Sequence, residues 1–136
     1  MTIRYLLDTN LCIHIAKYNP SGVRARFERY TAEELAMSAI TLGELRHGAE
    51  KSQAPATASS AIDQLTSAIR VMEIGDAVAA QYGKIRARLE LAGQIIGNND
   101  LWIAAHALAE GWILVTNHER EFKRVAGLKI ENWAEP

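Results

Sequence analysis

Short apolar runs alternate with longer amphipathic stretches along the whole chain. Each run has a length typical of a buried strand, and polar or glycine-rich positions separate it from the next stretch. The pattern predicts strands over Ile3–Leu7, Ala36–Ala39, Val71–Ile74, Ile113–Val115 and Leu128–Asn132. Strands that alternate with helices form mostly parallel sheets with helices on both faces. We therefore expect an α/β fold, a three-layer sandwich whose central, mostly parallel sheet has about five strands.

The stretches between these runs predict helices, and several of them start with residues that cap helices. The expected helices are Leu11–Tyr18, Ser21–Tyr30, a segment from Thr41, Pro55–Ile69, Asp76–Ala92, Leu101–Glu110 and Glu119–Arg124. Thr41 and Glu44 have the spacing of a capping box. Asp76 and the Asn98-Asn99-Asp100 triplet stand where N-caps are expected, and Gly93 stands where a long helix should end.

The composition fits one globular domain, residues 1–136. Hydrophobic residues make up 49% of the 136 residues, charged residues 23%, and the formal net charge is −1. The overall basic balance of many nucleic-acid binders is therefore absent, so local patches matter instead. The lone cysteine, Cys12, excludes an internal disulfide and is expected to be buried. We find no signal-peptide pattern and no membrane-length apolar run, so we expect a cytoplasmic protein.

Acidic residues recur at places where a parallel sheet builds its sites. Asp8 comes directly after the first predicted strand, Asp100 opens a helix, and Glu121 follows the turn after the fourth strand. Glu44 lies near the start of another helix, directly after Gly43, where a missing side chain could let other backbone approach. Each of the four taken alone also fits a helix cap or a solvated charge. Together they suggest convergence, because such folds place sites at the carboxyl ends of their strands.

Oxygen donors dominate this set, and that limits the metal it would bind. Carboxylates without clustered His or Cys favour Mg²⁺ or Mn²⁺ over zinc. Asn10, Thr116 and Asn117 lie beside the acidic residues and could orient carboxylates or water. The residues thus predict a magnesium site in which Mn²⁺ can substitute.

Four motifs in order resemble the VapC toxins of bacterial toxin–antitoxin modules, which belong to the PIN-domain nucleases. They are L-L-D-T-N (6–10), T-L-G-E-L-R-H-G-A-E-K-S (41–52), I-G-N-N-D-L-W-I-A-A-H-A-L (96–108) and V-T-N-H-E-R-E-F-K-R-V-A-G-L-K-I-E-N-W (115–133). The match covers nearly the whole chain, from about residue 3 to residue 133. One D-T-N motif is a weak signal, whereas four in order at compatible separations are a strong one.

The resemblance implies a PIN-like fold and a metal-dependent endoribonuclease with an acidic quartet. By motif position the quartet is Asp8, Glu44, Asp100 and Glu121, which would be both catalytic and metal-binding. Many relatives carry an aspartate directly after the T-N pair, where this chain has His118, so the fourth role falls to Glu121 as the less secure member. The segments G-A-E-K-S and R-E-F…E-N-W look most like the enteric-type subgroup. That likeness implies cleavage of initiator tRNA in the anticodon loop, a homodimer, and inhibition by a cognate VapB-type antitoxin.

RNA needs positive charge on its approach to an acidic site. The RNA-binding candidates are Arg46, Lys84, Arg86 and Arg88, although such residues also make ordinary solvated faces. Trp102 could stack on a base of a loop, and the alternative is packing against a neighbour or a dimer partner.

Two other classes of function stay open at this point. One is a catalytically silent PIN scaffold that binds RNA or protein, and the other is a metal phosphohydrolase acting on a small molecule. The clustered carboxylates argue against the silent scaffold. An aspartyl-phosphate enzyme is disfavoured, because no D-x-D-x-T motif follows the first strand.

Overall fold

Five strands form the centre of the fold in a computed structural model that describes residues 2–18 and 32–133. They are β1 (Tyr5–Leu7), β2 (Leu35–Ser38), β3 (Arg70–Met72), β4 (Ile113–Val115) and β5 (Ile130–Glu131). Their order is β3-β2-β1-β4-β5, and every neighbouring pair is parallel. The α/β prediction is confirmed, and the sheet is parallel throughout.

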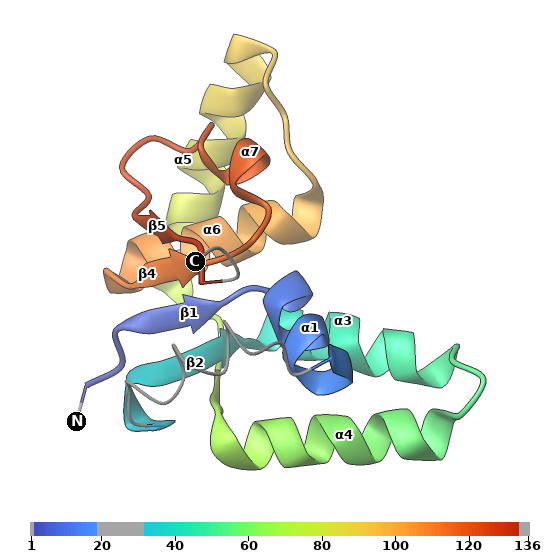
Figure 1. Ribbon diagram of the computed structural model, residues 1–136. Helices are drawn as coiled ribbons and strands as arrows, with labels where there is room; N and C mark the ends of the chain where they lie inside the picture. Colours follow the sequence, from blue (N-terminus) through green and yellow to red (C-terminus); the bar gives the residue numbers. More distant parts are fainter. Residues whose placement is uncertain (1, 19–31, 134–136) are drawn as a thin grey trace.

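Helices cover both faces of this sheet (Figure 1). In chain order they are α1 (Thr9–Tyr18), the short 3₁₀ turn η1 (Ala32–Glu34), α3 (Ala39–Glu50), α4 (Pro55–Ala68), α5 (Asp76–Ala92), α6 (Asn98–Glu110) and α7 (Glu119–Phe122). Figure 1 shows α3 and α4 side by side in the lower half of the view and α5, α6 and α7 in the upper half. The three-layer arrangement is therefore also confirmed.

A strand of three residues can serve both layers because its side chains alternate between the two faces. Leu6 packs into the core formed with α5 and α6, whereas Tyr5 and Leu7 pack into the core formed with α1, α3 and α4. All three residues are almost completely buried. Such burial on both faces explains why the strand reads as a continuous apolar run and not as an alternating one.

Three predicted N-caps are wrong, and in each case a neighbouring residue takes the position. Helix α3 begins at Ala39, and its N-cap is Ser38, whose hydroxyl accepts a hydrogen bond from the Ile40 N–H at 3.2 Å. The Thr41–Glu44 capping box therefore does not form, because both residues already lie inside the helix. Asp76 is the first residue of α5 after the N-cap Gly75.

Helix α6 likewise starts after a glycine cap, Gly97, so the Asn98-Asn99-Asp100 triplet forms its first turn and does not cap it. The side chains of the triplet are thereby free for contacts outside the helix. The end of α5 at Gly93 follows the prediction, and α6 ends in the same way at Gly111. Gly93 and Gly111 end α5 and α6 with φ of +65° and +75°, a left-handed conformation that glycine adopts without strain.

The remaining points concern single buried residues, membrane helices and one predicted helix. Cys12 is a free and fully buried thiol, as expected, and burial raises its pKa far above the ordinary value. Trp112 and Trp133 are core residues. None of the helices in the described residues is both long and apolar enough to cross a membrane. The helix predicted over Ser21–Tyr30 lies outside the described residues.

Candidate active site

Asp8 is the most deeply fixed carboxylate of the candidate site. It follows β1 at the carboxyl edge of the sheet, and only 2% of it is exposed. Its Oδ1 accepts a hydrogen bond from the Leu11 N–H at 2.8 Å, which caps α1, and its Oδ2 accepts one from the Thr116 hydroxyl. Asp8 is therefore the cap of α1, one of the two alternatives that the sequence offered, and its role as a metal-binding carboxylate stays a prediction. Burial raises the pKa of Asp8, and the two hydrogen bonds act against that rise.

Thr116 and Asn117 follow β4, the strand next to β1, and so reach the same edge. The Thr116 hydroxyl donates to Asp8 and accepts from the His118 N–H at 2.9 Å, so it ties the end of β4 to the end of β1. Within the described part of the chain, the buried side-chain oxygen of Asn117 has no hydrogen-bond partner. A buried oxygen without a donor is rare, and it marks a place where a water or a cation would be favourable. His118 is exposed, and its charge lowers the pKa of Asp8.

Glu44 reaches the site from α3 and is held there by α1. The Thr9 hydroxyl lies 2.5 Å from Glu44 Oε1 and 3.2 Å from the Thr41 hydroxyl, which is completely buried. This bridge explains why Thr41 does not cap its helix. Gly43 is not needed for a close approach, since a side chain there would meet no atom within 4 Å, so that expectation is wrong.

Asp100 and Glu121 make the more open half of the site. Asp100 lies in the first turn of α6 and is half-buried, and Glu121 lies on α7 and is exposed. Burial and the negative charges of Glu121, Glu44 and Asp8 raise the pKa of Asp100 to about 6. Glu121 also lies within hydrogen-bonding reach of Asp100.

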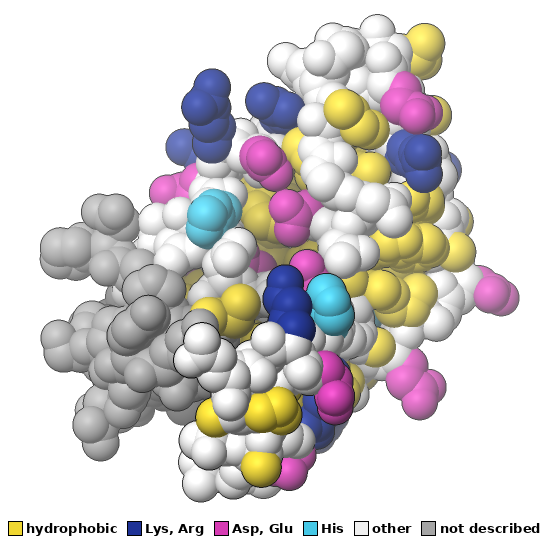
Figure 2. Space-filling model, turned by 90° about the vertical axis from the view of Figure 1, so that its right-hand side faces the viewer, with side chains coloured by type: hydrophobic (Ala, Val, Ile, Leu, Met, Phe, Trp, Pro, Cys, Tyr) yellow, Lys and Arg dark blue, Asp and Glu magenta, His cyan; other side chains and the backbone are white. Residues whose placement is uncertain are grey.

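These interactions bring all four acidic side chains into one cluster, although they lie as far apart in sequence as Asp8 and Glu121. Figure 2 shows acidic side chains gathered around a hollow near the centre of this face, with Lys and Arg side chains above and below it. Among the residues that the structure describes, no three His, Cys, Asp or Glu side chains form a ready-made set of metal ligands. The acidic side chains therefore raise the pKa of Asp8 and of Asp100 without forming a compact set of ligands. Of the predicted supporting residues, Thr116 and Asn117 are built into this edge, whereas Asn10 is exposed.

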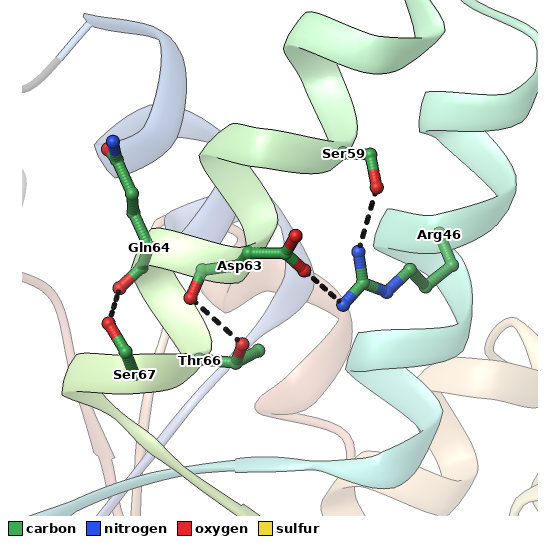
Figure 3. Close-up of polar contacts among 6 residues, drawn as sticks. All are labelled: Arg46, Ser59, Asp63, Gln64, Thr66 and Ser67. Carbon is green, nitrogen blue, oxygen red and sulfur yellow. Dashed lines mark hydrogen bonds and ion pairs between the residues drawn. The ribbon is translucent and has the colours of Figure 1, made fainter.

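Arg46 lies two residues after Glu44, but its guanidinium faces α4. Nη2 forms an ion pair with Asp63 Oδ1 at 2.8 Å, and Nη1 donates to the Ser59 hydroxyl at 3.2 Å (Figure 3). Both contacts join α3 to α4. RNA binding by Arg46 stays a prediction, and it would compete with the contacts that Arg46 makes with Asp63 and Ser59.

The three basic candidates on α5 lie on different sides of that helix. Lys84 and Arg88 are one turn apart and share a side, whereas the intervening Arg86 points about 160° away from both. Arg86 Nη1 donates to the Tyr82 hydroxyl at 2.8 Å, and its Nε lies 3.4 Å from Glu90 Oε2. Trp102 stacks on the Tyr82 ring, with 3.8 Å between the ring centroids, so the packing alternative is confirmed for this tryptophan.

Two polar contacts near the site were not predicted from the sequence. One is the Thr9–Thr41 bridge; Thr9 was visible in the D-T-N triplet, but its partner was assigned to a cap. The other is a buried pair in which His106 Nδ1 lies 2.9 Å from the Ser38 hydroxyl, and burial lowers the pKa of His106. Ser38 and His106 are 68 positions apart, so no local pattern could have paired them.

Chemically, the arrangement offers several hard oxygen donors beside exposed positive charge. Comparison with known proteins finds similar sequences along nearly the whole chain. A model of the PIN domain family matches residues 5–128. "Ribonuclease VapC2" of Haemophilus influenzae is 42% identical over 131 residues, which are 96% of this chain and 98% of that protein. "tRNA(fMet)-specific endonuclease VapC" of Shigella flexneri is 42% identical over 132 residues, 97% of this chain and 99% of that one.

Solved structures give the same result. The crystal structure of DNA-bound VapBC from Salmonella typhimurium contains a chain with a TM-score of 0.93 and 39% identity. The similarity covers 97% of this chain and 99% of that chain. The arrangement of strands and helices described above is therefore shared along nearly the full length of both chains.

Proposed function

The chain belongs to the VapC group of the PIN-domain family, and from that premise we propose that it is the endoribonuclease toxin of a toxin–antitoxin pair. One observation carries the proposal: four carboxylates from separate parts of the chain lie near enough for their charges to raise the pKa of Asp8 and of Asp100. Such a cluster repels itself, so it is costly for the fold unless it binds a cation. The names of the relatives from Haemophilus and Shigella support RNA, and specifically initiator tRNA, as the substrate.

Magnesium, with Mn²⁺ as a substitute, is the cation that the site residues fit best. The donors are carboxylate, hydroxyl and amide oxygens, and the unpartnered oxygen of Asn117 is of the same hard type. Mg²⁺ usually keeps several waters and binds through one or two carboxylates plus substrate phosphates. A fully closed set of protein ligands is therefore not required. Asp8 and Asp100 would hold the ion directly, with Glu44 and Glu121 completing the negative field.

The side chains divide the work of phosphodiester hydrolysis among them. A bound Mg²⁺ supplies a Lewis acid that neutralises charge developing on the phosphate. Asp8 keeps a fixed orientation through its bonds to Leu11 and Thr116, which is the precision that positioning a reacting group requires. Asp100 would supply the second direct ligand, because burial and the negative charges of its neighbours raise its pKa to about 6 and a cation would offset those charges.

The partners follow from the same relatives. The VapBC complexes among the similar structures support a VapB-type antitoxin as the partner of this chain. Inhibition by that antitoxin and a homodimeric assembly, which the likeness to the enteric-type subgroup implies, are part of the proposal. A tRNA substrate implies action in the cytoplasm. The anticodon loop is the proposed target, as the likeness to the enteric-type subgroup implies, and single-stranded loops expose bases and backbone that a duplex hides.

A cleavage assay on a purified tRNA pool tests the proposal. The wild-type chain is incubated with Mg²⁺, with Mn²⁺ and with a chelator, beside Asp8→Asn, and the fragments are resolved on a gel. We expect fragments only from the wild type with metal, derived from initiator tRNA. Equal cutting by wild type and Asp8→Asn would refute the role given to Asp8.

One observation favours a second candidate, a silent scaffold that binds RNA without cutting it. No ready-made group of three metal ligands occurs in residues 2–18 and 32–133. Calorimetric titration with Mn²⁺ separates the two candidates. An enzyme should bind the ion at a site that Asp100→Asn weakens, whereas a silent scaffold should show no saturable binding.

A further inference from the structure

The hydroxyl of Thr41 is a buried polar group that the proposed chemistry does not use. Thr41 lies inside α3, three residues before Glu44, and is completely buried. Within the described part of the chain, the polar contact recorded for its hydroxyl is with the Thr9 hydroxyl at 3.2 Å. Thr9 in turn contacts Glu44 Oε1 at 2.5 Å. Thr41 is therefore connected to one of the four acids through a single intermediate hydroxyl.

The chemistry of these groups fixes the direction of both hydrogen bonds. An ionised carboxylate can only accept, so the proton between Thr9 and Glu44 belongs to Thr9. A threonine hydroxyl has one proton, so Thr9 cannot also donate to Thr41. Thr41 therefore donates to Thr9, and Thr9 donates to Glu44. In such a chain each hydrogen bond polarises the next one and strengthens it.

The chain of hydroxyls leaves the two oxygens of Glu44 in different states. Oε1 accepts from Thr9, whereas Oε2 has no hydrogen bond or ion pair recorded among residues 2–18 and 32–133. Asp8 differs, because each of its oxygens accepts from the protein. The charge of Glu44 acts within the cluster, since it raises the pKa of both Asp8 and Asp100. Glu44 thus has one oxygen fixed by the protein and one oxygen open to a cation or its waters.

We propose that Thr41 is a positioning residue for Glu44, because its hydroxyl directs the Thr9 proton onto Oε1 and leaves Oε2 for a hydrated Mg²⁺. This role rests on the proposed ribonuclease function and names how that site orients one of its acids. A glutamate side chain has much conformational freedom to lose, and a fixed Oε1 removes part of that freedom before the ion arrives. Thr41 itself touches neither the ion nor the RNA.

Calorimetric titration of the full chain with Mn²⁺, in a double-mutant cycle, tests this role. Thr9→Val should weaken Mn²⁺ binding about 30-fold, within the range for a lost partner of a metal-binding side chain. Thr41→Val, one bond further from the ion, should weaken it about fivefold, below that range. If Thr41 acts through Thr9, the double variant should bind Mn²⁺ no more weakly than Thr9→Val alone. A Thr41 that contributes only packing would instead give the sum of the two single losses.

The conservative variant and the cleavage kinetics separate the hydroxyl from the shape of the side chain. Thr41→Ser keeps the hydroxyl and should restore most of the Mn²⁺ affinity. In steady-state cleavage of purified initiator tRNA with Mg²⁺, Thr41→Val should lower kcat about fivefold and change KM less than about twofold, because Thr41 does not touch the RNA. The Tm in chelator shows whether each variant is folded.

Thr66→Val is the matched control, because it changes the same atoms in another helix. The Thr66 hydroxyl donates to the Asp63 backbone carbonyl within α4 at 3.2 Å (Figure 3), so its loss should leave Mn²⁺ affinity and kcat unchanged. Wild-type affinity in Thr41→Val, additive losses in the cycle, or equal losses in Thr41→Val and Thr41→Ser would each overturn the role of Thr41 and leave the nuclease intact. A wild-type chain that neither binds Mn²⁺ saturably nor cuts RNA would overturn the proposed function, and the role of Thr41 with it.

Discussion

Asp8 and Asp100 have the same proposed role in opposite surroundings. Asp8 is buried, and each of its oxygens accepts a hydrogen bond from the protein. Asp100 is half-buried, and its strongest charged neighbours are three other acids. The fold itself thus satisfies the first carboxylate, whereas the second is satisfied only when something positive arrives. Asp8 is therefore part of the folded framework, whereas Asp100 belongs to a group of negative charges that the protein itself does not compensate.

The largest expected effect comes from removing each carboxylate in turn. Asp8→Ala and Asp100→Asn should both lower RNA cleavage by at least about 100-fold, because each removes a proposed metal ligand. Their effects on stability should have opposite signs. Asp8→Ala leaves the Leu11 N–H and the Thr116 hydroxyl without an acceptor, which should cost about 1–3 kcal/mol. Asp100→Asn relieves repulsion, so it should raise the free energy of unfolding in chelator, as measured by urea denaturation.

Asp8→Asn is the control for this pair, because its amide oxygen can still accept from Leu11. It should be as inactive as Asp8→Ala and clearly more stable. A loss of stability of the same size in Asp8→Ala and Asp100→Asn would show that the two halves do not differ as described.

The sequence could predict the sheet and the acidic residues because both depend on local pattern. A buried strand such as β1 appears as an apolar run, and Asp8 stands directly after it. The mostly parallel direction of the strands followed from the alternation of strands and helices, whereas their order did not, and the four motifs supplied the quartet. What the sequence could not supply is the pairing of distant side chains, as between Ser38 and His106.

The capping of α3 is a second case in which a local pattern did not predict the contacts of a side chain. Thr41 and Glu44 have the spacing of a capping box, but Ser38 starts the helix three residues earlier. Thr41 and Glu44 then bond to Thr9, which lies on a different helix. Contacts between helices therefore replace the capping box that the local spacing predicts, and they do so at the candidate site.

The next largest effect concerns pH in the metal-free protein. Asp100 holds its proton more tightly in the folded chain, where its pKa is about 6, than in the unfolded chain, where it is 3.8. Raising the pH through this window therefore lowers the free energy of unfolding, and the loss is complete above about pH 6. A pKa difference of this size corresponds to at most about 3 kcal/mol, and solvent screening of a half-buried group reduces it to about 1–2 kcal/mol.

Denaturation of wild type and Asp100→Asn in chelator at several pH values measures how much Asp100 contributes to the free energy of unfolding. Burial lowers the pKa of His106, which acts with the opposite sign at acidic pH but is common to both proteins and cancels. The variant should gain on the wild type between pH 4 and 6 and keep a constant lead above that. Mg²⁺ at pH 7.5 should raise the Tm of the wild type more than that of the variant, and equal shifts would contradict the proposed ligand.

A smaller effect is expected at the link between β4 and β1. Thr116→Val removes the hydroxyl that donates to Asp8 and accepts from the His118 N–H. We expect a loss of about 1 kcal/mol in stability, together with a loss of roughly tenfold or more in Mn²⁺ affinity measured by calorimetry. Thr116→Ser keeps the hydroxyl and should retain most of both. If serine weakens Mn²⁺ binding as much as valine does, keeping the hydroxyl is not sufficient to position Asp8.

The smallest effect is expected at Glu121, the exposed member of the quartet. Glu121→Gln removes the largest charged contribution to the raised pKa of Asp100, so that pKa should fall, while burial keeps it above 3.8. NMR titration of the Asp100 carboxyl measures the shift directly. Cleavage should fall by roughly tenfold or less, because three carboxylates remain. Glu119→Gln, on the same short helix but bonded to Asn132, is the control and should change neither quantity. A Glu121→Gln variant with an unchanged Asp100 titration would mean that α7 lies farther from α6 in solution, and the fourth acidic role would then belong to another group.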